Sequence, residues 1–575
     1  MHSGRSPFPF AQKFGLVAAA ALLAACSTSS DHRAPSGARL SLAQPATLAG
    51  GCDTLAGKLA GLAHTRVLSV KAVAKDELKA GATPVPEHCL VTGAMHERTG
   101  TDGKTPYAIG FEMRLPIDWN GRFFYQGNGG IDGAVLPALG ALGGGPLTSA
   151  LHQGFAVISS DAGHDNRLTR GPGFGLDPQA RLDYGYQAVG KLTPMAKELI
   201  RRAYGKEPDR SYIGGCSNGG RHVLVAAARY AGMYDGFLAG APGYRLPLAA
   251  VANIFGAQQY AKVATDPKDL GSAFTQPERQ AVVNAVLNRC DALDGVKDGM
   301  VQDTQACQAA FDFQRDVPTC VAGRDGTCLT LGQKAAIAPI FSGATTRSGQ
   351  PFYAGFPFDT GLASPGVANW EFSAPLQRDS GAVGFIFGTP PQDPRSFNAE
   401  AFVLRGDIDA MLAAVAAKSG SFTESALEFM MPPDATDLSR VKARGGKVLV
   451  YHGVSDAIFS VQDTEAWYKG VAQRNGGDPS GFARFFQVPG MDHCRAGPAT
   501  DRFDALTPLV RWVEEGIAPD SITASARGAS DAVEANPDVP ASWSSTRSRP
   551  LCAYPKVARY KGSGDPEVAA SFECR

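Results

Sequence analysis

The chain has 575 residues and a mass of 60.1 kDa, which is long enough for more than one compact unit. Hydrophobic residues make up 44% of it and charged residues 19%, proportions that favour a folded globular protein over an intrinsically disordered one. The 55 Lys and Arg residues balance the 55 Asp and Glu residues. Because there is no basic excess to bind phosphates, the composition argues against nucleic acid as a partner.

The first 25 residues have the pattern of an export signal. Arg5 and Lys13 precede an apolar run at 14–25 that ends in small residues and is too short for a stable membrane span. The segment 23–26, Leu-Ala-Ala-Cys, resembles a bacterial lipobox, which predicts that Cys26 is the lipidated first residue of the mature protein. The alternative is ordinary cleavage near residue 25 that leaves Cys26 free.

Residues 26–45 are rich in Ser, Ala and Pro, a composition that predicts a tether. No later stretch is apolar enough to span a bilayer. We therefore expect an exported protein, as an outer-membrane lipoprotein or free in the periplasm or the medium. Its only contact with a membrane would be the N-terminal lipid anchor, and we expect a monomer.

Short apolar strand signals alternate with helical patterns over most of the remaining chain. The strand signals are 108–127, which holds two runs, 155–163, 211–215, 447–453 and 484–490, and the helical patterns are 181–205 and 501–516. This alternation predicts the α/β class, with a mostly parallel sheet and helices on both faces.

The stretch 246–435 breaks this rhythm. It holds four cysteines and an acidic glycine loop, and nine Phe, Tyr or Trp residues fall between 341 and 390. We interpret 246–435 as a lid domain inserted into a core formed by 46–245 and 436–575.

Residues 215–219, Gly-Cys-Ser-Asn-Gly, match the pattern G-x-S-x-G. The strand signal at 211–215 precedes them and a helical pattern at 221–232 follows. In this setting a sharp turn lifts a serine hydroxyl above the sheet, and the helix N-terminus favours negative charge beside it. The pattern predicts Ser217 as a nucleophile, with an ordinary glycine-rich turn as the alternative.

A serine nucleophile needs a base and an acid that orients the base. His493 follows the strand signal at 484–490, and Asp456 follows the strand signal at 447–453. The order Ser217, Asp456, His493 is the order of α/β-hydrolase triads. Asp492 is an alternative acid, but it is adjacent to the histidine, and adjacent side chains on a loop rarely face each other.

Ten cysteines remain when Cys26 is set aside, an even number that favours disulfides in an exported chain. Their spacing fits no zinc site. The sequence leaves the connectivity open, and pairing of near neighbours is the simplest arrangement. It gives Cys52–Cys89, Cys290–Cys307, Cys320–Cys328 and Cys552–Cys574.

Cys216 and Cys494 are the two cysteines left over, and they are adjacent to Ser217 and His493. In a working triad the serine and histidine side chains lie within hydrogen-bond reach. Their neighbours' Cα atoms then fall within disulfide range, which predicts a bridge. Two buried free thiols are the alternative.

These motifs resemble the tannase and feruloyl esterase family of α/β-hydrolases. That family shows a Cys-Ser pair, a catalytic Asp and a His-Cys pair whose cysteines are bridged, which correspond here to 216–217, Asp456 and 493–494. The resemblance covers nearly the whole mature chain and includes longer stretches such as WNGRFF, FGLDPQARLD and CDALDG. It implies an α/β-hydrolase core, an inserted lid, five bridges and a calcium ion in the lid.

The acidic loop that follows residue 290 is the expected calcium site. It supplies three carboxylates, and oxygen ligands from alternate positions of a short loop suit a hard cation. The resemblance adds two backbone carbonyls. The complete predicted ligand set is Asp291, Asp294, Val296, Asp298 and Met300. The spacing is not that of an EF-hand, a solvated acidic turn is the alternative, and the expected role is structural.

An oxyanion hole needs two backbone N–H donors. One is expected from Asn218, the residue after the nucleophile, and the other from the glycine run 127–130, where the resemblance points to Gly130. A simple turn is the alternative for that run. The terephthalate-monoester hydrolases of the family carry Glu at the position of Asn218, a departure that leaves a backbone donor intact.

Within the family the chain resembles in particular the enzymes that hydrolyse mono(2-hydroxyethyl) terephthalate. This resemblance implies that Arg378 grips the free carboxylate of the substrate and that Trp370 and Phe459 flank its aromatic ring. It also places His452 in the pocket, although His452 can equally be a core histidine, and a lone arginine is usually a surface residue. The run that follows the arginine in those enzymes is shortened here to AVGFIFG at 382–388.

We therefore expect an exported serine carboxylesterase without an organic cofactor, acting on small aromatic esters through an acyl-enzyme. The favoured reaction converts mono(2-hydroxyethyl) terephthalate to terephthalate and ethylene glycol. The alternative substrate class is a natural phenolic ester, cleaved by a feruloyl esterase or a tannase. Two further classes stay open: a non-catalytic surface-binding lipoprotein, and an acyltransferase that uses the same triad.

Overall fold

One mixed sheet of nine strands organises the computed structural model, which describes residues 40–80, 83–142, 149–528 and 535–575. The predicted signal peptide, Cys26 and most of the predicted tether lie outside the described residues. From edge to edge the strands are β13 (Ala483–Val488), β12 (Lys447–Gly453), β11 (Gly236–Gly240), β10 (Arg210–Cys216), β8 (Arg122–Gly127), β9 (Ala156–Ser160), β6 (Pro106–Pro116), β5 (His88–Thr99) and β2 (Thr65–Val73).

The six strands from β13 to β9 are parallel to their neighbours, as predicted. The edge formed by β6, β5 and β2 is antiparallel. Residues 236–240 of β11 and 447–453 of β12 are buried throughout. Both strands are mostly apolar and buried without alternation, because helices cover the two faces of the sheet.

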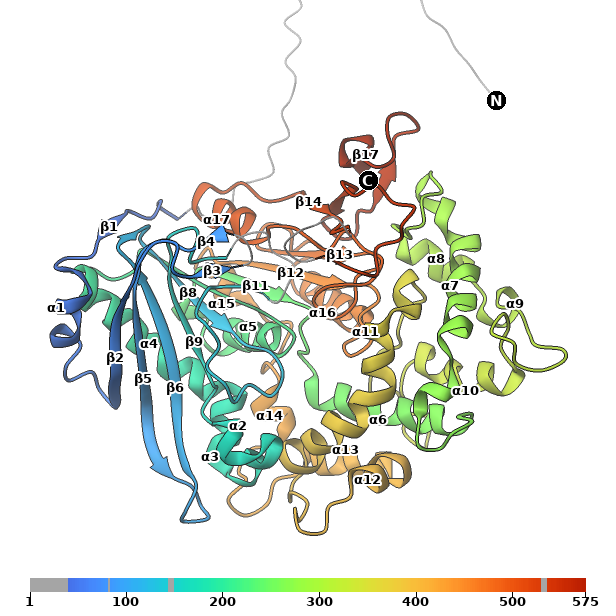
Figure 1. Cartoon of the computed structure of the whole chain (residues 1–575), viewed down its shortest axis with the longest axis horizontal. Coiled ribbons are helices and arrows are strands. Elements are labelled where there is room, and N and C mark those ends of the chain that lie inside the picture. Colours follow the sequence, from blue (N-terminus) through green and yellow to red (C-terminus); the bar gives the residue numbers. More distant parts are fainter. Residues whose placement is uncertain (1–39, 81–82, 143–148, 529–534) are drawn as a thin grey trace, which may run out of the picture. The chain divides into compact units, whose positions relative to one another are not determined.

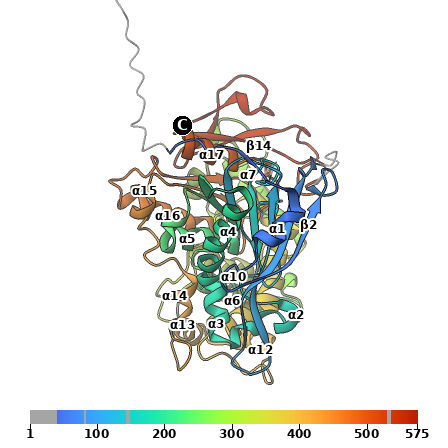
Figure 2. The same ribbon diagram turned by 90° about the vertical axis from the view of Figure 1, so that its left-hand side faces the viewer.

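One face packs against α1 (Gly51–Lys58), α4 (Ala188–Tyr204), α5 (Asn218–Arg229) and α16 (Val461–Gln473). In Figure 2, which views the molecule from the β2 edge, α1, α4 and α5 lie on the same side of β2. The other face packs against α17 (Leu506–Glu515), whose Leu509 and Trp512 are buried. The helix predicted at 181–205 is interrupted by a π-helical turn at 183–187 before α4 begins.

Between β11 and β12 the described chain forms helices and loops, with no strand beyond isolated bridges. Figure 1 shows most of these helices to the right of the sheet and below it. The α-helices of this segment are α6 (Leu246–Ala261), α7 (Gln276–Cys290), α8 (Thr304–Ala310), α9 (Phe313–Asp316), α10 (Leu331–Ser342), α11 (Pro365–Ala368), α12 (Ala399–Arg405), α13 (Ile408–Ala416), α14 (Ala426–Met430) and α15 (Ser439–Ala443). Their apolar core is continuous with residues of the first half of the chain such as Phe174 and Tyr184, and the described residues from 40 onward form one compact unit.

All five disulfides of the structure are the predicted ones. They are Cys52–Cys89, Cys216–Cys494, Cys290–Cys307, Cys320–Cys328 and Cys552–Cys574. The last pair ties β15 (Ser548–Cys552) to β17 (Phe572–Cys574). No described helix is long and apolar enough to cross a membrane.

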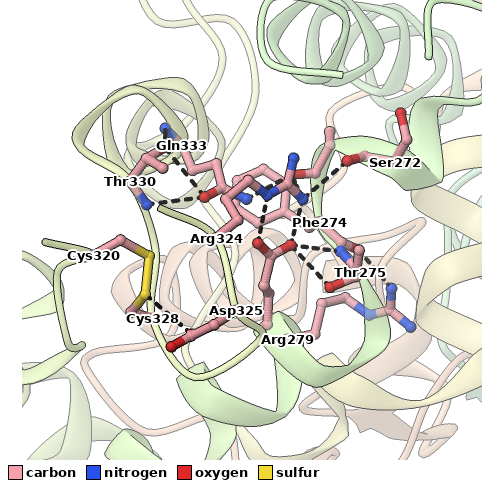
Figure 3. A network of polar contacts seen from close by, with 12 residues as sticks. Ser272, Phe274, Thr275, Arg279, Cys320, Arg324, Asp325, Cys328, Thr330 and Gln333 are labelled. Atoms are coloured by element: carbon pink, nitrogen blue, oxygen red, sulfur yellow. Dashed lines mark hydrogen bonds and ion pairs between the residues drawn. A yellow bond between two sulfur atoms is a disulfide. The ribbon is translucent and has the colours of Figure 1, made fainter. Parts of the chain in front are cut away.

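A partly buried ion pair holds the start of α7 to the loop closed by Cys320–Cys328 (Figure 3). Glu278 is 1% exposed and forms a capping box with Thr275. Its carboxylate accepts hydrogen bonds from Nε and Nη2 of Arg324 at 2.6 and 2.5 Å. This arrangement satisfies a charge that would be costly to bury alone.

We expect Arg324→Met to lower the free energy of unfolding by about 3 kcal/mol, because it leaves the Glu278 carboxylate buried without a counter-charge. Urea denaturation followed by circular dichroism measures the change. Arg315→Met is the control, since the Arg315–Asp316 pair lies on the surface and such pairs contribute about 0–1 kcal/mol. Equal losses in the two variants would contradict the role assigned to Arg324.

Candidate active site

Ser217 lies on a tight turn between β10 and α5. Its backbone has φ 66° and ψ −127°, a conformation that residues with a side chain rarely adopt. A Cβ atom at Gly215 or Gly219 would lie 2.4 or 2.3 Å from the carbonyl oxygen of Gly127. The two glycines therefore allow the elbow to approach β8 closely, and the predicted strand–turn–helix setting is present.

Asp456 and His493 are brought together from the loops after β12 and β13. Nδ1 of His493 lies 2.7 Å from Oδ2 of Asp456. The other carboxylate oxygen accepts the backbone N–H groups of Ile458 and Phe459, each at 3.0 Å. Because the carboxylate is an acceptor, Nδ1 of His493 carries the hydrogen, which leaves the lone pair of Nε2 available as a base.

Asp456 is 1% exposed, and burial alone raises the pKa of a carboxyl group. The charge of His493 and the hydrogen bonds from His452 and His493 outweigh burial and hold the pKa of Asp456 well below its usual range. Asp456 is therefore an anion at all ordinary pH values, as the acid of a triad must be.

His452 lies in the core beside Asp456, which favours the core alternative over a place in the substrate pocket. It is 0% exposed, and its Nδ1 lies 2.9 Å from Oγ1 of Thr464. Its Nε2 lies 3.1 Å from Oδ2 of Asp456 and 2.9 Å from the carbonyl oxygen of Phe459. Both of those are acceptors, so Nε2 donates to the triad acid. The expectation that His452 binds substrate does not fit this position.

The rival acid Asp492 does not contact the imidazole of His493. Its Oδ2 accepts a hydrogen bond from Oγ of Ser364 at 2.6 Å, and the residue is 3% exposed. Burial raises the pKa of Asp492 well above its usual value, and the nearby carboxylates add to this. The geometry therefore favours Asp456 as the partner of His493.

Ser217 and His493 are linked through their neighbours. The disulfide Cys216–Cys494 joins the elbow to the histidine loop across 278 positions of sequence, with 6.1 Å between the Cα atoms. Nε2 of His493 is buried and has no hydrogen-bond partner, so the bond to Oγ of Ser217 is not formed in this structure. Such bonds are often long in free enzymes and shorten when substrate binds.

Gly130 and Asn218 both lie beside Ser217. All three line one small cavity of about 20 Å³. Asn218 begins α5, where the first backbone N–H groups have no partner within the helix. Gly130 has φ 70° and follows β8. The two predicted donors thus follow the carboxyl ends of β8 and β10, which are neighbouring parallel strands.

The same cavity is lined by Arg378 and Phe459. No described carboxylate lies within ion-pair distance of Arg378, and its guanidinium stacks on the ring of Trp370 at 5.0 Å. Trp370 and Phe459 flank the ring of His493, each with 5.3 Å between centroids. The structure therefore gathers Arg378, Trp370 and Phe459 around the nucleophile and the base, and places an unpaired cation at the cavity wall.

A second, apolar cavity of about 40 Å³ lies between α6, α7, α10 and the loop after β12. Asp456 lines this cavity, but Ser217 and His493 do not. Of the two cavities, only the smaller one gives access to the nucleophile.

The acidic loop after α7 holds the three predicted carboxylates, those of Asp291, Asp294 and Asp298. Asp291 accepts the backbone N–H groups of Asp298 and Gly299, at 3.0 and 3.1 Å. Oδ2 of Asp294 is buried without any partner, and burial with the charges of Asp298 and Asp291 raises the pKa of Asp294 to about 7. A bound cation would give that unpartnered oxygen a ligand contact. The oxygen donors of the loop are of the kind that calcium prefers.

The side chains of this loop are not arranged as a complete metal site. Asp298 also pairs with Arg549, which competes for its carboxylate. Across the described ranges no three His, Cys, Asp or Glu side chains converge as a preformed metal centre.

Three residues with buried side chains next to the elbow were missed from the sequence: Asp132, Arg221 and His222. Their only signal was their closeness in sequence to Gly130 and Asn218. Contacts between 132 and 218 cross 86 positions, so no local pattern could have predicted them.

Comparisons with known proteins agree with this geometry. A family model described as tannase and feruloyl esterase matches residues 89–575. The chain belongs to this family. It is 39% identical to the mono(2-hydroxyethyl) terephthalate hydrolase of Piscinibacter sakaiensis over 538 residues, with 86% of each chain covered. It is 28% identical to a protein of Neosartorya fischeri named "Probable feruloyl esterase B-1", over 80% of this chain and 82% of that one.

Solved structures of the family share the fold. Feruloyl esterase B from Aspergillus oryzae aligns with a TM-score of 0.71 at 24% identity, covering 91% of this chain and 99% of that chain. The tannin acyl hydrolase from Aspergillus niger aligns with a TM-score of 0.64 at 19% identity, covering 93% and 96%. The fold is that of the α/β-hydrolases, and the protein is a carboxylic ester hydrolase.

We expect replacement of both Cys216 and Cys494 by Ala to lower activity toward an activated aromatic ester by about 100-fold, because the base and the nucleophile lose their fixed spacing. The free energy of unfolding should fall by about 2–4 kcal/mol. Steady-state kinetics and urea denaturation measure the two effects.

The matched control replaces Cys320 and Cys328, which are 8 positions apart in sequence. The short loop that they close does not contain a triad residue. This control should lose less stability, because the loop is short, and should keep its activity. Full activity in the Cys216/Cys494 double variant would show that the bridge does not position the triad.

Proposed function

We propose that this esterase is a serine carboxylesterase that cleaves esters of aromatic carboxylic acids through an acyl-enzyme. Ser217 attacks the acyl carbon, and His493 takes its proton and returns it to the leaving alcohol. Asp456 holds the tautomer of His493 and stabilises its charge. The observation that carries this proposal is the hydrogen bond between Asp456 and His493 on a loop bridged to the elbow by Cys216–Cys494.

The two backbone N–H groups of Gly130 and Asn218 are the proposed oxyanion donors. Both residues line the cavity beside Ser217, and donors there stabilise the negative charge that develops on the acyl oxygen. After the alcohol leaves, water activated by His493 attacks the acyl-enzyme and releases the acid.

The favoured substrate is mono(2-hydroxyethyl) terephthalate, with terephthalate and ethylene glycol as products. The support is the unpaired Arg378 at the cavity wall, together with the 39% identity to a hydrolase named for this ester. A bidentate arginine–carboxylate pair selects a ligand with a free carboxylate. Natural feruloyl and galloyl esters are the second candidate, supported by the family itself.

We further propose that residues 246–435 act as a lid that contributes Arg378 and Trp370 to the site. Export is the proposed localisation, and five disulfides support an oxidising compartment. Lipidation at Cys26 stays part of this proposal.

A structural calcium ion at Asp291, Asp294 and Asp298 is also proposed, with the backbone carbonyls of Val296 and Met300 as further ligands. The support is the buried, unpartnered Oδ2 of Asp294. Bound there, the ion would supply charge neutralisation and hold the loop that the Cys290–Cys307 bridge encloses.

Rapid mixing with an activated aromatic ester tests the acyl-enzyme. The wild-type protein should release a burst of alcohol equal to the active-site concentration, since acylation precedes slower deacylation. Ser217→Ala should remove both the burst and the steady state. Turnover that persists in Ser217→Ala at the wild-type rate would exclude Ser217 as the nucleophile.

A panel of mono(2-hydroxyethyl) terephthalate, methyl ferulate and methyl gallate tests the substrate. We expect Arg378→Ala to lower kcat/KM for the terephthalate monoester by about 10- to 100-fold, the value of a lost hydrogen bond to a charged group, and to leave the two neutral esters nearly unchanged. Arg395→Ala, which removes an exposed arginine elsewhere in 246–435, is the control. An equal loss on all three esters would contradict the carboxylate grip.

Thermal unfolding in the presence of a chelator or of calcium tests the metal site. Calcium at about 100 times its Kd should add about 2.7 kcal/mol of stability, and magnesium should not replace it. Asp294→Asn should abolish the difference between chelator and calcium, whereas Asp325→Asn, in another loop, should retain it. Identical thermal unfolding midpoints with and without calcium would contradict the proposed calcium site.

A further inference from the structure

Two segments that supply the proposed oxyanion donors also meet through their side chains. Asp132 lies in the loop after β8, two positions beyond Gly130, and Asn218 begins α5. Nδ2 of Asn218 donates to Oδ1 of Asp132 at 2.5 Å. Asn218 is 1% exposed and the side chain of Asp132 is 3% exposed, so water does not compete for this contact.

The orientation of the Asn218 amide is determined from both sides. Its Oδ1 accepts a hydrogen bond from Nε of Arg221 at 2.6 Å. Because an arginine only donates, the amide oxygen must face Arg221 and the amide nitrogen must face Asp132. Asn218 therefore connects a buried cation to a buried carboxylate, donating to one and accepting from the other.

Arg221 is itself held rigidly. It is 0% exposed, and its Nη atoms donate to the carbonyl oxygens of Tyr184, Gly185 and Met430 at 3.0, 2.7 and 3.2 Å. These carbonyls belong to the π-helical turn before α4 and to the end of α14. Through Arg221, the position of Asn218 is thus fixed relative to two elements outside the elbow.

The loop on the other side is oriented by its own backbone. The N–H of Asp132 donates to the carbonyl oxygen of Gly129 at 3.3 Å. In a trans peptide the N–H of the next residue points opposite to that carbonyl, so the N–H of Gly130 faces away from Asp132. Asn166 donates to the carbonyl oxygen of Asp132 at 2.7 Å, and Tyr184 to that of Gly130 at 3.3 Å.

We propose that Asp132, Asn218 and Arg221 form a positioning relay that sets the spacing between the two oxyanion donors. None of the three side chains needs to touch the reacting atoms: the relay acts through the backbone N–H groups of Gly130 and Asn218. This inference rests on the proposed serine mechanism and adds residues that determine its transition-state stabilisation.

The polarity of the relay gives a sharp test. N218D keeps the shape of the side chain but sets two carboxylates against each other, so the bond to Asp132 is lost. The swapped variant D132N/N218D reverses the bond, because the amide of residue 132 then donates to the carboxylate of residue 218, which still accepts from Arg221. D132N alone keeps an acceptor oxygen for Asn218.

We expect N218D to lower kcat by about 10- to 100-fold, in the range of losing part of one oxyanion donor, with KM nearly unchanged. D132N should lose little, and D132N/N218D should recover to within about fivefold of the wild type, as expected for directly coupled residues. Asn218→Ser removes the bond without adding a charge and should lose activity like N218D, so the test does not depend on how N218D folds.

A second readout separates positioning from stability. Binding of an aryl boronic acid, which forms a tetrahedral adduct with a serine hydroxyl, should weaken in N218D by the same factor as kcat/KM and recover in the swap. All rates are divided by the burst amplitude, so unfolded protein is not counted. The control is Asn120→Asp, at the other end of β8. The side-chain amide of Asn120 donates a hydrogen bond to the carbonyl oxygen of Gln153. This variant should have a lower thermal midpoint and unchanged kcat and boronate binding.

Two results would overturn the relay while leaving the mechanism in place. One is N218D with wild-type kcat and boronate affinity in an enzyme whose burst depends on Ser217. The other is a swapped variant no more active than N218D. Ester turnover that does not depend on Ser217 would overturn the proposed function, and the relay with it.

Discussion

The covalent bond between Cys216 and Cys494 is the constraint on which the site depends. The nucleophile and the base lie on loops after β10 and β13, which are separated in the sheet by β11 and β12. Loops are the most mobile parts of an α/β fold, and the sheet fixes only where each loop begins. A disulfide between the residues next to Ser217 and His493 removes the remaining freedom at the point where the chemistry needs it.

Buried charge does the remaining positioning. Asp456 accepts from two backbone N–H groups and from two histidines, so its carboxylate is fully bonded and cannot rotate without losing partners. The orientation of His493 follows from it, and His452 supports the acid from the core side. On the other flank of the elbow, Asp132 and Arg221 hold Asn218 in the same way. Two satisfied networks thus bracket the serine.

In the proposed mechanism, chemistry and recognition come from different parts of the chain. The strands of the sheet deliver the triad and the glycine donor to one edge, because the carboxyl ends of parallel strands meet there. The segment between β11 and β12 adds Arg378 and Trp370 around the same cavity. If the proposed roles hold, one catalytic frame would serve esters of different acids through changes in the inserted segment.

By itself the sequence indicated the fold class, the main strands along the chain, the elbow and the candidate triad. Simple pairing of near neighbours, together with the family resemblance, predicted the five disulfides that the structure contains. These features have local signatures: apolar runs, glycines around a serine, and cysteines beside the residues they clamp. Only the tertiary structure decided that His452 supports Asp456, that Arg378 is unpaired at the cavity wall, and that Asp132 meets Asn218. Each of these depends on which side chains pack together across more than a local stretch of chain or on which partners are missing, and local periodicity encodes backbone conformation rather than such contacts.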